Sequence, residues 1–293
     1  RKNTQNLSEY VNQILDIQKI DRNQLKLSVG EVDLQQSLTS VVENFSALIE
    51  EKSLDVSLDI KPIIAWFDEA KMSRIFYNLI SNAIKYSNEG GEIEIHAYQN
   101  DNIIQIDFKD YGIGIPEKQQ HLIFDRFTRG TNVSNKGIPG TGIGLMLSKK
   151  IIELHGGKLL LKSRENIGST FSVLLQKGTE HYQKEHLIQL LEKKQDDNML
   201  SRHVDKEKLI LLVEDNEDLR NAIKDELSSD FKLITATNGK EGLFVAISKN
   251  PDLIITDVMM AKMDGMELCE LLKTNFKTSH IPVIMLTALS DTE

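Results

Sequence analysis

The pattern of apolar positions changes near residue 208 of the 293-residue chain. Residues 33–177 combine helical spacing with short runs in which apolar and polar side chains alternate, as in helices packed on one face of a partly exposed sheet. In residues 208–293, continuous apolar runs such as Leu209–Val213 alternate strictly with helical segments, which is typical of strands buried on both faces. We therefore predict a mixed-sheet α+β sandwich followed by an α/β, doubly wound parallel sheet.

The segments outside these two domains have simpler patterns. Residues 1–32 are expected to hold an amphipathic helix and a connector. The apolar stripe of that helix, which needs a partner, is formed by Leu7, Val11, Ile14 and Leu15. Residues 33–52 are expected to form one helix that is capped by Asp33. Residues 178–207 are mostly polar and are expected to be a linker with helical content.

Composition narrows the class of protein. The chain has 35 basic and 44 acidic side chains, and residues 206–293 alone hold 10 basic and 16 acidic ones. This balance argues against nucleic-acid binding. A single cysteine, Cys269, excludes an intrachain disulfide, and no apolar run approaches the roughly 20 residues of a membrane helix. We expect a cytoplasmic location and no membrane contact by these residues. Because the chain starts at Arg1, in a helical pattern, we expect it to be part of a longer protein whose membrane anchor, if it has one, lies upstream.

One predicted helix carries a polar stripe with candidate chemistry. Asp68 is expected to cap a helix that runs to about Tyr86. On it, Asn78, Asn82 and Lys85 are spaced four and three residues apart and so share one face. The amide oxygens can coordinate Mg²⁺ and the ammonium group can meet a phosphate. An ordinary solvated helix face is the alternative.

Three further clusters follow in order along the chain. Asp110 ends a strand before Gly112 and Gly114, and its carboxylate can accept a hydrogen bond from an exocyclic amine; a simple turn is the alternative. In the stretch Gly137–Leu145, glycines allow backbone N–H groups to approach phosphate oxygens at a helix N-terminus. This stretch fits neither the dinucleotide fingerprint nor the P-loop. Gly168–Phe171 is a turn that enters the last strand.

Together, and in this order, the clusters resemble the N, G1, G2 and G3 boxes of the catalytic domain of sensor histidine kinases, a Bergerat-fold ATPase. The segment Ile123–Phe127 with Arg129 resembles the F box. The resemblance implies ATP and Mg²⁺ as cofactors, with Asp110 binding the adenine amine. It implies that Asn82 ligates Mg²⁺ and that Asn78 and Lys85 serve the metal and phosphates, with Arg126 or Arg129 at the terminal phosphate. The remaining nucleotide-binding residues that it implies are Gly112, Gly114, Gly140, Thr141, Gly142, Gly144, Leu145 and Thr170.

The resemblance leaves one component unaccounted for. None of the seven histidines has the sequence context of the family's phosphoacceptor. The first helix is similar to the second helix of the family's dimerisation hairpin. We therefore expect the acceptor histidine upstream of Arg1, on a hairpin that forms a homodimer in the parent protein.

Acidic residues follow the predicted strands of the C-terminal half. Glu214 and Asp215 follow the first strand, Asp257 the third and Thr287 the fourth. Because ligands of open parallel sheets bind at the carboxyl ends of strands, three carboxylates there predict a Mg²⁺ site. With the metal bound, Asp257 could attack a phosphoryl donor.

The surrounding residues resemble a response-regulator receiver domain. This resemblance implies phosphorylation of Asp257, metal ligation by Glu214, Asp215 and the carbonyl of Met259, and a switch role for Thr287. The family usually has proline where Ala261 stands. Receivers also carry a lysine at the end of a fifth strand, so we expect residues 208–293 to lack the last strand and helix.

The combined prediction is part of a hybrid sensor histidine kinase of a bacterial two-component system. It would transfer the γ-phosphoryl group of ATP to a histidine outside residues 1–293, with the receiver aspartate as the next acceptor. The alternatives are a nucleotide-sensing regulatory scaffold without kinase activity, and another Bergerat-fold ATPase that hydrolyses ATP to drive motion.

Overall fold

The computed structural model describes residues 2–22, 24–126, 128, 142–187 and 208–286. The chain forms two compact units. One comprises residues 22–197, and the other joins residues 1–21 to residues 198–293. Each unit is described by itself.

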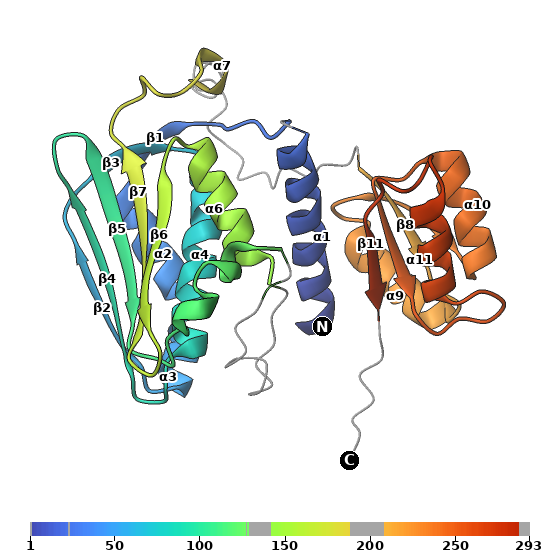
Figure 1. Ribbon diagram of the computed structural model, residues 1–293, viewed down its shortest axis with the longest axis horizontal. Helices are drawn as coiled ribbons and strands as arrows, with labels where there is room; N and C mark the ends of the chain where they lie inside the picture. The colour runs from blue at the N-terminus through green and yellow to red at the C-terminus, as the bar shows by residue number, and fades with distance from the viewer. Residues whose placement is uncertain (1, 23, 127, 129–141, 188–207, 287–293) are drawn as a thin grey trace. The chain divides into compact units, whose positions relative to one another are not determined.

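The unit of residues 22–197 is a five-stranded mixed sheet with helices on one face (Figure 1). The strand order is β2 (Asp55–Ile60), β4 (Glu92–Gln99), β5 (Ile103–Asp110), β7 (Gly168–Gln176) and β6 (Lys158–Arg164). All neighbours are antiparallel except β2 and β4. The covering helices are α2 (Leu34–Glu43), α4 (Glu69–Tyr86) and α6 (Gly144–Leu154). The predicted mixed-sheet sandwich is confirmed.

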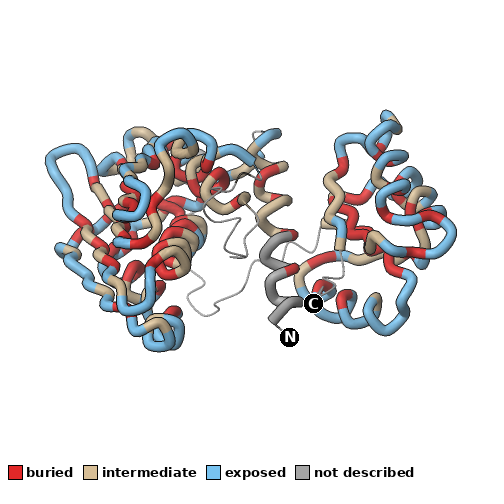
Figure 2. Tube along the Cα trace, turned by 60° about the horizontal axis from the view of Figure 1, so that its bottom comes forward, coloured by how far each residue is buried: buried red, intermediate tan, exposed pale blue. Residues whose placement is uncertain are grey.

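Alternation along the strands builds the core of this unit. In β5, Ile104, Ile106 and Phe108 are buried while the residues between them are only partly buried. Figure 2 shows buried positions interspersed with more exposed ones along the chain in this unit. The buried face packs against α4, where Phe76 lies 6.0 Å from Phe108 between ring centroids. The apolar stripe of α4 and the inward face of the sheet therefore form one core.

Both predicted helix caps form, but the helix expected over residues 33–52 is broken into two. Asp33 accepts a hydrogen bond from the N–H of Gln36, and Asp68 one from the N–H of Lys71. The expected helix over 33–52 instead forms α2 and a separate α3 (Ser46–Glu51). A two-stranded antiparallel sheet of β1 (Gly30–Asp33) and β3 (Ile64–Phe67) was not predicted. Two short 3₁₀ helices follow β5, η1 (Glu117–Gln119) and η2 (Leu122–Phe124).

The chain folds back on this unit after β7. Tyr182 packs with Leu27 and Val29 in a small buried cluster, and its hydroxyl donates to the carbonyl of Trp66 at 2.8 Å. The short helix α7 (Lys184–Leu187) follows. The sequence analysis placed the limits of this domain at residues 33 and 177. The compact unit begins before the first limit and extends beyond the second.

The second unit contains a four-stranded parallel sheet. Its order is β11 (Val283–Leu286), β10 (Leu253–Asp257), β8 (Leu209–Val213) and β9 (Lys232–Ala236). Helices α10 (Gly239–Lys249) and α11 (Gly265–Thr274) share the core of one face, and α9 (Glu217–Leu227) lies on the other. The predicted doubly wound parallel sheet is confirmed.

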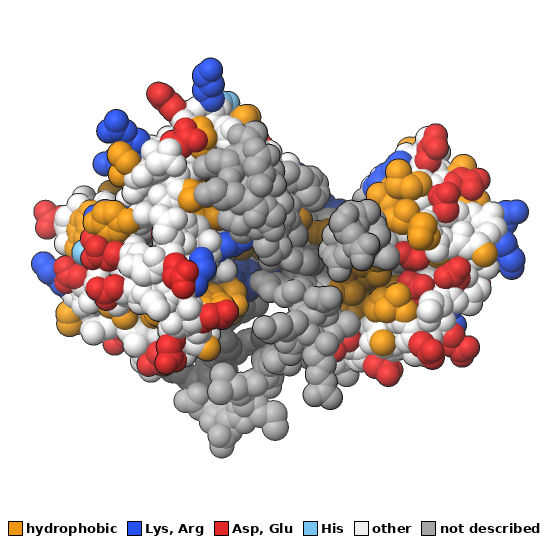
Figure 3. Space-filling model, turned by 90° about the horizontal axis from the view of Figure 1, so that it is seen from below, with side chains coloured by type: hydrophobic (Ala, Val, Ile, Leu, Met, Phe, Trp, Pro, Cys, Tyr) orange, Lys and Arg blue, Asp and Glu red, His pale blue; other side chains and the backbone are white. Residues whose placement is uncertain are grey.

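Helix α1 (Lys2–Asp21) packs on the same face as α9. Its residues Leu7, Val11 and Leu15 are buried in a cluster with Ile210 of β8 and Ile223 of α9. The partner that the amphipathic stripe requires is thus supplied by a sheet about 200 residues away in the chain. Among the described residues, no helix has the length and apolarity needed to cross a bilayer. On the face seen in Figure 3, acidic and basic side chains are mixed over the ATPase unit, while acidic ones are more frequent over the other unit.

Candidate functional site

The polar stripe of α4 meets the N-terminus of α6. Asn78, Asn82 and Lys85 are all half-buried. The side-chain amide of Asn78 donates to the hydroxyl of Ser148 at 3.0 Å. A Cβ atom at Gly144, the first residue of α6, would lie only 2.4 Å from Oδ1 of Asn78, so any larger residue there would displace the Asn78 side chain. Ser148 fixes the side-chain amide so that its oxygen faces the start of α6.

The C-terminal end of α4 is held by a lysine that the sequence did not single out. The ammonium group of Lys52 donates to the carbonyls of Ile84, Lys85 and Ser87, at 2.9, 3.3 and 3.2 Å. Ile84 and Lys85 lie in the last turn of α4, whose carbonyls have no partner inside the helix, and Ser87 is its C-cap. A cation at a helix C-terminus is also favoured by the dipole. Lys52 therefore stabilises the turn that presents the Lys85 side chain.

Asp110 ends β5 next to this turn and is 6 % exposed. The backbone N–H groups of Gly112 and Ser169 donate to its carboxylate, the former at 3.0 Å. Burial is the larger effect, and it raises the pKa of Asp110 to about 6. Near neutral pH, Asp110 is therefore a mostly ionised, poorly hydrated hydrogen-bond acceptor.

Two glycines let the loop after Asp110 pass close to other backbone atoms. A Cβ atom at Gly112 would lie 2.1 Å from the carbonyl oxygen of Tyr86, at the end of α4. Gly114 has a φ of +60°, and its Cβ would lie 2.0 Å from the carbonyl oxygen of Arg164. Both positions require glycine, so the loop locks Asp110 against the end of α4.

The register of β7 against β5 determines which residue lies beside Asp110. Asp110 pairs with Ser169, whereas Thr170 pairs with Lys109. Because side chains alternate along a strand, Thr170 points to the face opposite Asp110. The residue of β7 that shares a face with Asp110 is therefore Ser169 and not the predicted Thr170; Ser169 is buried, and its hydroxyl lies 3.0 Å from that of Ser163.

A buried histidine joins α6 to the start of α4. Nε2 of His155 accepts a hydrogen bond from the N–H of Asp68 at 3.0 Å, and Nδ1 donates to the carbonyl of Ile151 at 2.8 Å. These partners require the neutral ring with its proton on Nδ1. Burial lowers the pKa of His155 to about 4. His155 therefore fixes the relative position of the two helices that carry Asn78 and Gly144.

Some of the remaining predicted nucleotide-binding residues are described by the structure, and others lie outside the described residues. Gly142 has a φ of +70°, and it precedes α6, which contains Leu145. Arg126 is exposed after η2. The sites predicted at Arg129, Gly140, Thr141 and Thr287 lie outside the described residues.

The predicted acidic cluster forms in the second unit. One ligand atom from each of Glu214, Asp215 and Asp257 lies within 4.8 Å of the others. The N–H of Asn216 donates to Oε1 of Glu214 at 3.1 Å, while Oε2 is buried and has no hydrogen-bond partner among the described residues. Burial, and after it the charges of Asp257 and Asp215, raise the pKa of Glu214. An orphaned carboxylate oxygen beside two more carboxylates fits a hard divalent cation.

Backbone contacts fix the orientation of this cluster. The N–H of Val258 donates to Oδ1 of Asp257 at 2.8 Å, and the N–H of Ala261 donates to Oδ2 of Asp215 at 3.2 Å. The guanidinium of Arg220 donates to the carbonyl of Glu214 at 2.8 Å. Met259, whose carbonyl is a predicted metal ligand, is 77 % exposed.

Comparisons with known proteins assign both units to families. Residues 67–179 match the family described as histidine kinase-, DNA gyrase B- and HSP90-like ATPase, which implies ATP binding, and residues 210–293 match the response regulator receiver domain. The chain is 35 % identical to histidine kinase P4 of Formosa agariphila over 306 residues, covering 97 % of this chain and 22 % of that protein. It is 31 % identical to the sensor histidine kinase TmoS of Ectopseudomonas mendocina, covering 99 % of this chain and 32 % of that one. It thus spans about a fifth to a third of the length of these relatives.

A solved structure shares the fold of the whole chain. The crystal structure of full-length ShkA in complex with AMPPNP aligns with a TM-score of 0.53 and 16 % sequence identity. The alignment covers 96 % of this chain and 82 % of that one.

Proposed function

Since the chain is a histidine kinase ATPase domain followed by a receiver domain, and so belongs to the hybrid sensor histidine kinases, we propose that it catalyses the ATP-dependent phosphorylation of a histidine. The acceptor histidine would lie on a dimerisation hairpin of the parent protein. The receiver would then accept the phosphoryl group on Asp257. A cytoplasmic location, where ATP is available, belongs to the same proposal.

The observation that carries this proposal is the convergence of Asn78, Gly144 and Asp110 around α4. Asp110 would accept the hydrogen bond of the adenine amine, and the α6 N-terminus would face the phosphates. Asn78 and Asn82 offer amide oxygens to Mg²⁺, and Lys85 offers a positive charge to the phosphates. We assign charge stabilisation at the terminal phosphate to Arg126 or Arg129.

Transfer to the receiver would proceed by attack of a carboxylate oxygen of Asp257 on the phosphorus atom of a phosphohistidine. The P–N bond breaks, a P–O bond forms, and the imidazole leaves with its electron pair. A Mg²⁺ ion held by Glu214, Asp215 and the carbonyl of Met259 would offset the negative charges that this approach brings together. We assign the switch role to Thr287.

A labelling experiment tests the kinase proposal. The chain is mixed with a separately supplied dimerisation hairpin of a related kinase and with ATP labelled at the γ-phosphate. We expect acid-labile, base-stable label on the hairpin, and its loss in Asn82→Ala. The matched control is Asn102→Ala, a substitution at an exposed position in the loop between β4 and β5. Full labelling by Asn82→Ala would contradict the proposal.

A nucleotide-sensing scaffold without kinase activity is the competing function. It requires nucleotide binding but no transfer. Tight binding of an ATP analogue, together with no label on hairpins from several related kinases, would favour the scaffold. Rapid release of phosphate without any protein acceptor would instead indicate an ATPase.

A further inference from the structure

The segment that follows β7 covers the segment that enters the ATPase unit. Residues 181–187, here called the strap, lie against residues 24–29, here called the connector. The N–H of Val29 in the connector donates to the carbonyl of His186 in the strap at 3.2 Å. Tyr182 of the strap is buried in one cluster with apolar side chains of the connector. The chain therefore enters and leaves this unit at one place.

The strap and the connector are both bound where α4 begins and α6 ends. The N–H of Ser28 in the connector donates to Oδ2 of Asp68, the N-cap of α4, at 2.8 Å. The ring of Tyr182 lies perpendicular to that of His155, the C-cap of α6, with the ring centroids 6.1 Å apart. His155 in turn accepts the hydrogen bond from the N–H of Asp68. These contacts join the strap, the connector and the two helix ends in one network.

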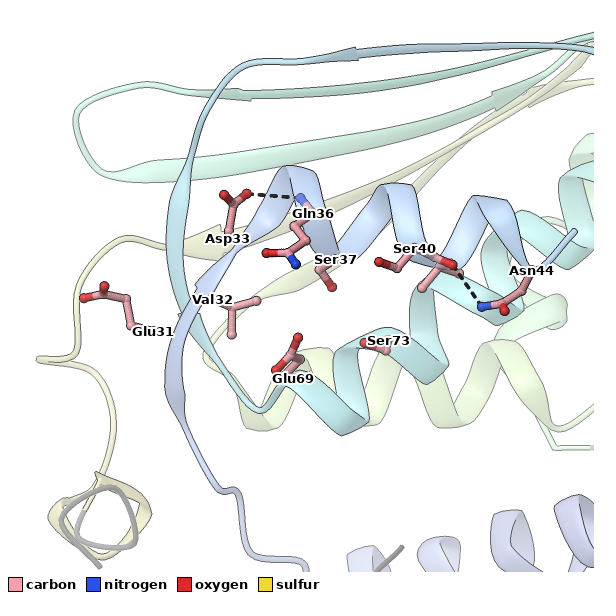
Figure 4. A pocket seen from close by; sticks show the side chains of 10 residues that line it. Glu31, Val32, Asp33, Gln36, Ser37, Ser40, Asn44, Glu69 and Ser73 are labelled. Carbon is pink, nitrogen blue, oxygen red and sulfur yellow. Dashed lines mark hydrogen bonds between the residues drawn. The ribbon is translucent and has the colours of Figure 1, made fainter. Parts of the chain in front are cut away.

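The connector continues into β1, which passes the first turn of α4. There, Val32 of β1 and Glu69 of α4 line the same polar pocket, which has a volume of about 450 Å³ (Figure 4). The entering chain is therefore held next to the start of α4 from the connector through β1.

The same pair of helices carries the proposed nucleotide site. The start of α4 meets the end of α6 through Asp68 and His155. Farther along α4, Asn78 meets Gly144, the first residue of α6. The two helices are therefore antiparallel, and α6, about 16 Å long, separates the strap from the nucleotide-facing helix start. Rigid helices of this kind can carry energetic coupling between two sites.

The strap has the features of an element that opens locally. Its only helix among the described residues, α7, has four residues, and its buried apolar contact with the connector is a small cluster. Nε2 of His181 is buried and has no hydrogen-bond partner among the described residues. This unmade hydrogen bond opposes docking, because water would satisfy the atom in the open form. Elements of such low local stability open while the rest of a domain stays folded.

We propose that docking of the strap and binding of nucleotide are coupled. The docked strap holds α4 and α6 in the arrangement that binds nucleotide, and bound nucleotide holds the strap closed. This inference rests on the proposed function. Because the strap begins the segment that leads to the receiver, its docking connects that segment with the nucleotide site. Thermodynamic linkage requires both effects to have the same factor.

Calorimetric titration of the full chain with a non-hydrolysable ATP analogue and Mg²⁺ tests one direction of the coupling. Tyr182→Ala removes the ring that contacts His155 and should weaken binding about fivefold to tenfold. Tyr182→Phe keeps the ring and removes only the hydroxyl that donates to Trp66, so it should weaken binding less. The matched control is Tyr98→Ala, which removes the same side chain from an exposed position of β4 and should leave the affinity unchanged.

Hydrogen exchange at single amides of the full chain, measured by NMR, tests the other direction. The amide of Val29 is bonded to the strap and so reports its docking. Saturating nucleotide should slow exchange of this amide by about the factor by which Tyr182→Ala weakens binding. Without nucleotide, Tyr182→Ala should speed its exchange. The internal control is the amide of Lys61, which donates to the carbonyl of Ala97 in the sheet and should not respond.

The outcomes separate the coupling from the proposed function. Equal nucleotide affinity in Tyr182→Ala and the unchanged chain, or exchange at Val29 that does not respond to nucleotide, would overturn the coupling and leave the function standing. Absence of nucleotide binding by the unchanged chain would contradict both. If Tyr182→Ala lacks a cooperative urea transition in Trp66 fluorescence, it is unfolded, and the affinity of Tyr182→Phe then decides: equality with the unchanged chain would overturn the coupling.

Discussion

The substitution Asp110→Asn tests two consequences of burying a carboxylate at the proposed nucleotide site. The buried charge should lower the stability of the fold, and it should strengthen the binding of adenine nucleotides. In the folded chain the pKa of Asp110 is about 6, against an ordinary value of 3.8. Because the folded pKa is raised, the carboxyl contributes its full stability below pH 3.8, and this contribution is lost as the pH rises through 6. A shift of about 2 units corresponds to a cost of about 3 kcal/mol near pH 7.5.

The amide of asparagine removes that charge but has only one oxygen for the N–H groups of Gly112 and Ser169. The lost acceptor costs about 1–2 kcal/mol. We therefore expect Asp110→Asn to raise the free energy of unfolding by about 1 kcal/mol at pH 7.5. The same change should weaken binding of adenine nucleotides at least tenfold, because the ionised acceptor is lost. The residue thus lowers stability in favour of binding.

The pH profile sharpens this prediction. His155 has a folded pKa of about 4, below its ordinary value of 6.5, so its contribution is complete above pH 6.5 and is lost as the pH falls toward 4. When the pH falls from 7.5 to 5, the titration of His155 lowers the free energy of unfolding by about 2 kcal/mol, and the protonation of Asp110 raises it by about 1 kcal/mol. The two contributions partly cancel, so the stability of the ATPase unit should fall less between pH 7.5 and 5 in the unchanged chain than in Asp110→Asn.

Urea unfolding followed by Trp66 fluorescence provides the assay. Trp66 is the single tryptophan of the chain and lies in β3, so its signal reports the ATPase unit and not the receiver. Asp107→Asn, on the opposite face of β5, is the matched control. Destabilisation by Asp110→Asn at pH 7.5, or nucleotide affinity equal to that of the control, would refute the reasoning.

Three other substitutions test the site. His155→Gln should flatten the acid side of the stability profile, and an unchanged slope in Trp66 fluorescence melts would show that His155 is not the titrating group. Ser148→Ala should weaken Mg²⁺-dependent nucleotide binding several-fold, with Ser148→Thr retaining more affinity, and identical calorimetric affinities would contradict the orientation of Asn78 by this hydroxyl. Gly112→Ala should lower the free energy of unfolding by more than about 2 kcal/mol, because its Cβ would meet the Tyr86 carbonyl; a smaller loss in urea would show that the loop can move.

Local patterns were sufficient for most elements of the fold. The caps Asp33 and Asp68, the alternating strands and the buried parallel strands all depend on nearby residues, and the structure confirms them. The break between α2 and α3 was missed because Val41, Phe45 and Leu48 maintain helical spacing across it. Strand β1 was missed because four residues are too short to show alternation.

The unpredicted parts of the site depend on contacts between distant residues. Choosing between Ser169 and Thr170 requires the register of β7 against β5, which local spacing does not fix. Lys52 becomes a helix cap only because the fold brings it to carbonyls more than 30 residues away. The partner of the α1 stripe could not be predicted from periodicity, which indicates that a partner is needed but not which one.

The most direct test of the account is calorimetric titration of the chain with a non-hydrolysable ATP analogue, with and without Mg²⁺. We predict one site per chain whose affinity increases when Mg²⁺ is present. Asn82→Ala should lose that increase but keep the metal-free affinity, while Asp110→Asn should weaken binding under both conditions. Absence of binding, or an unchanged response to Mg²⁺ in Asn82→Ala, would contradict the assignment of the α4 face as a metal-nucleotide site.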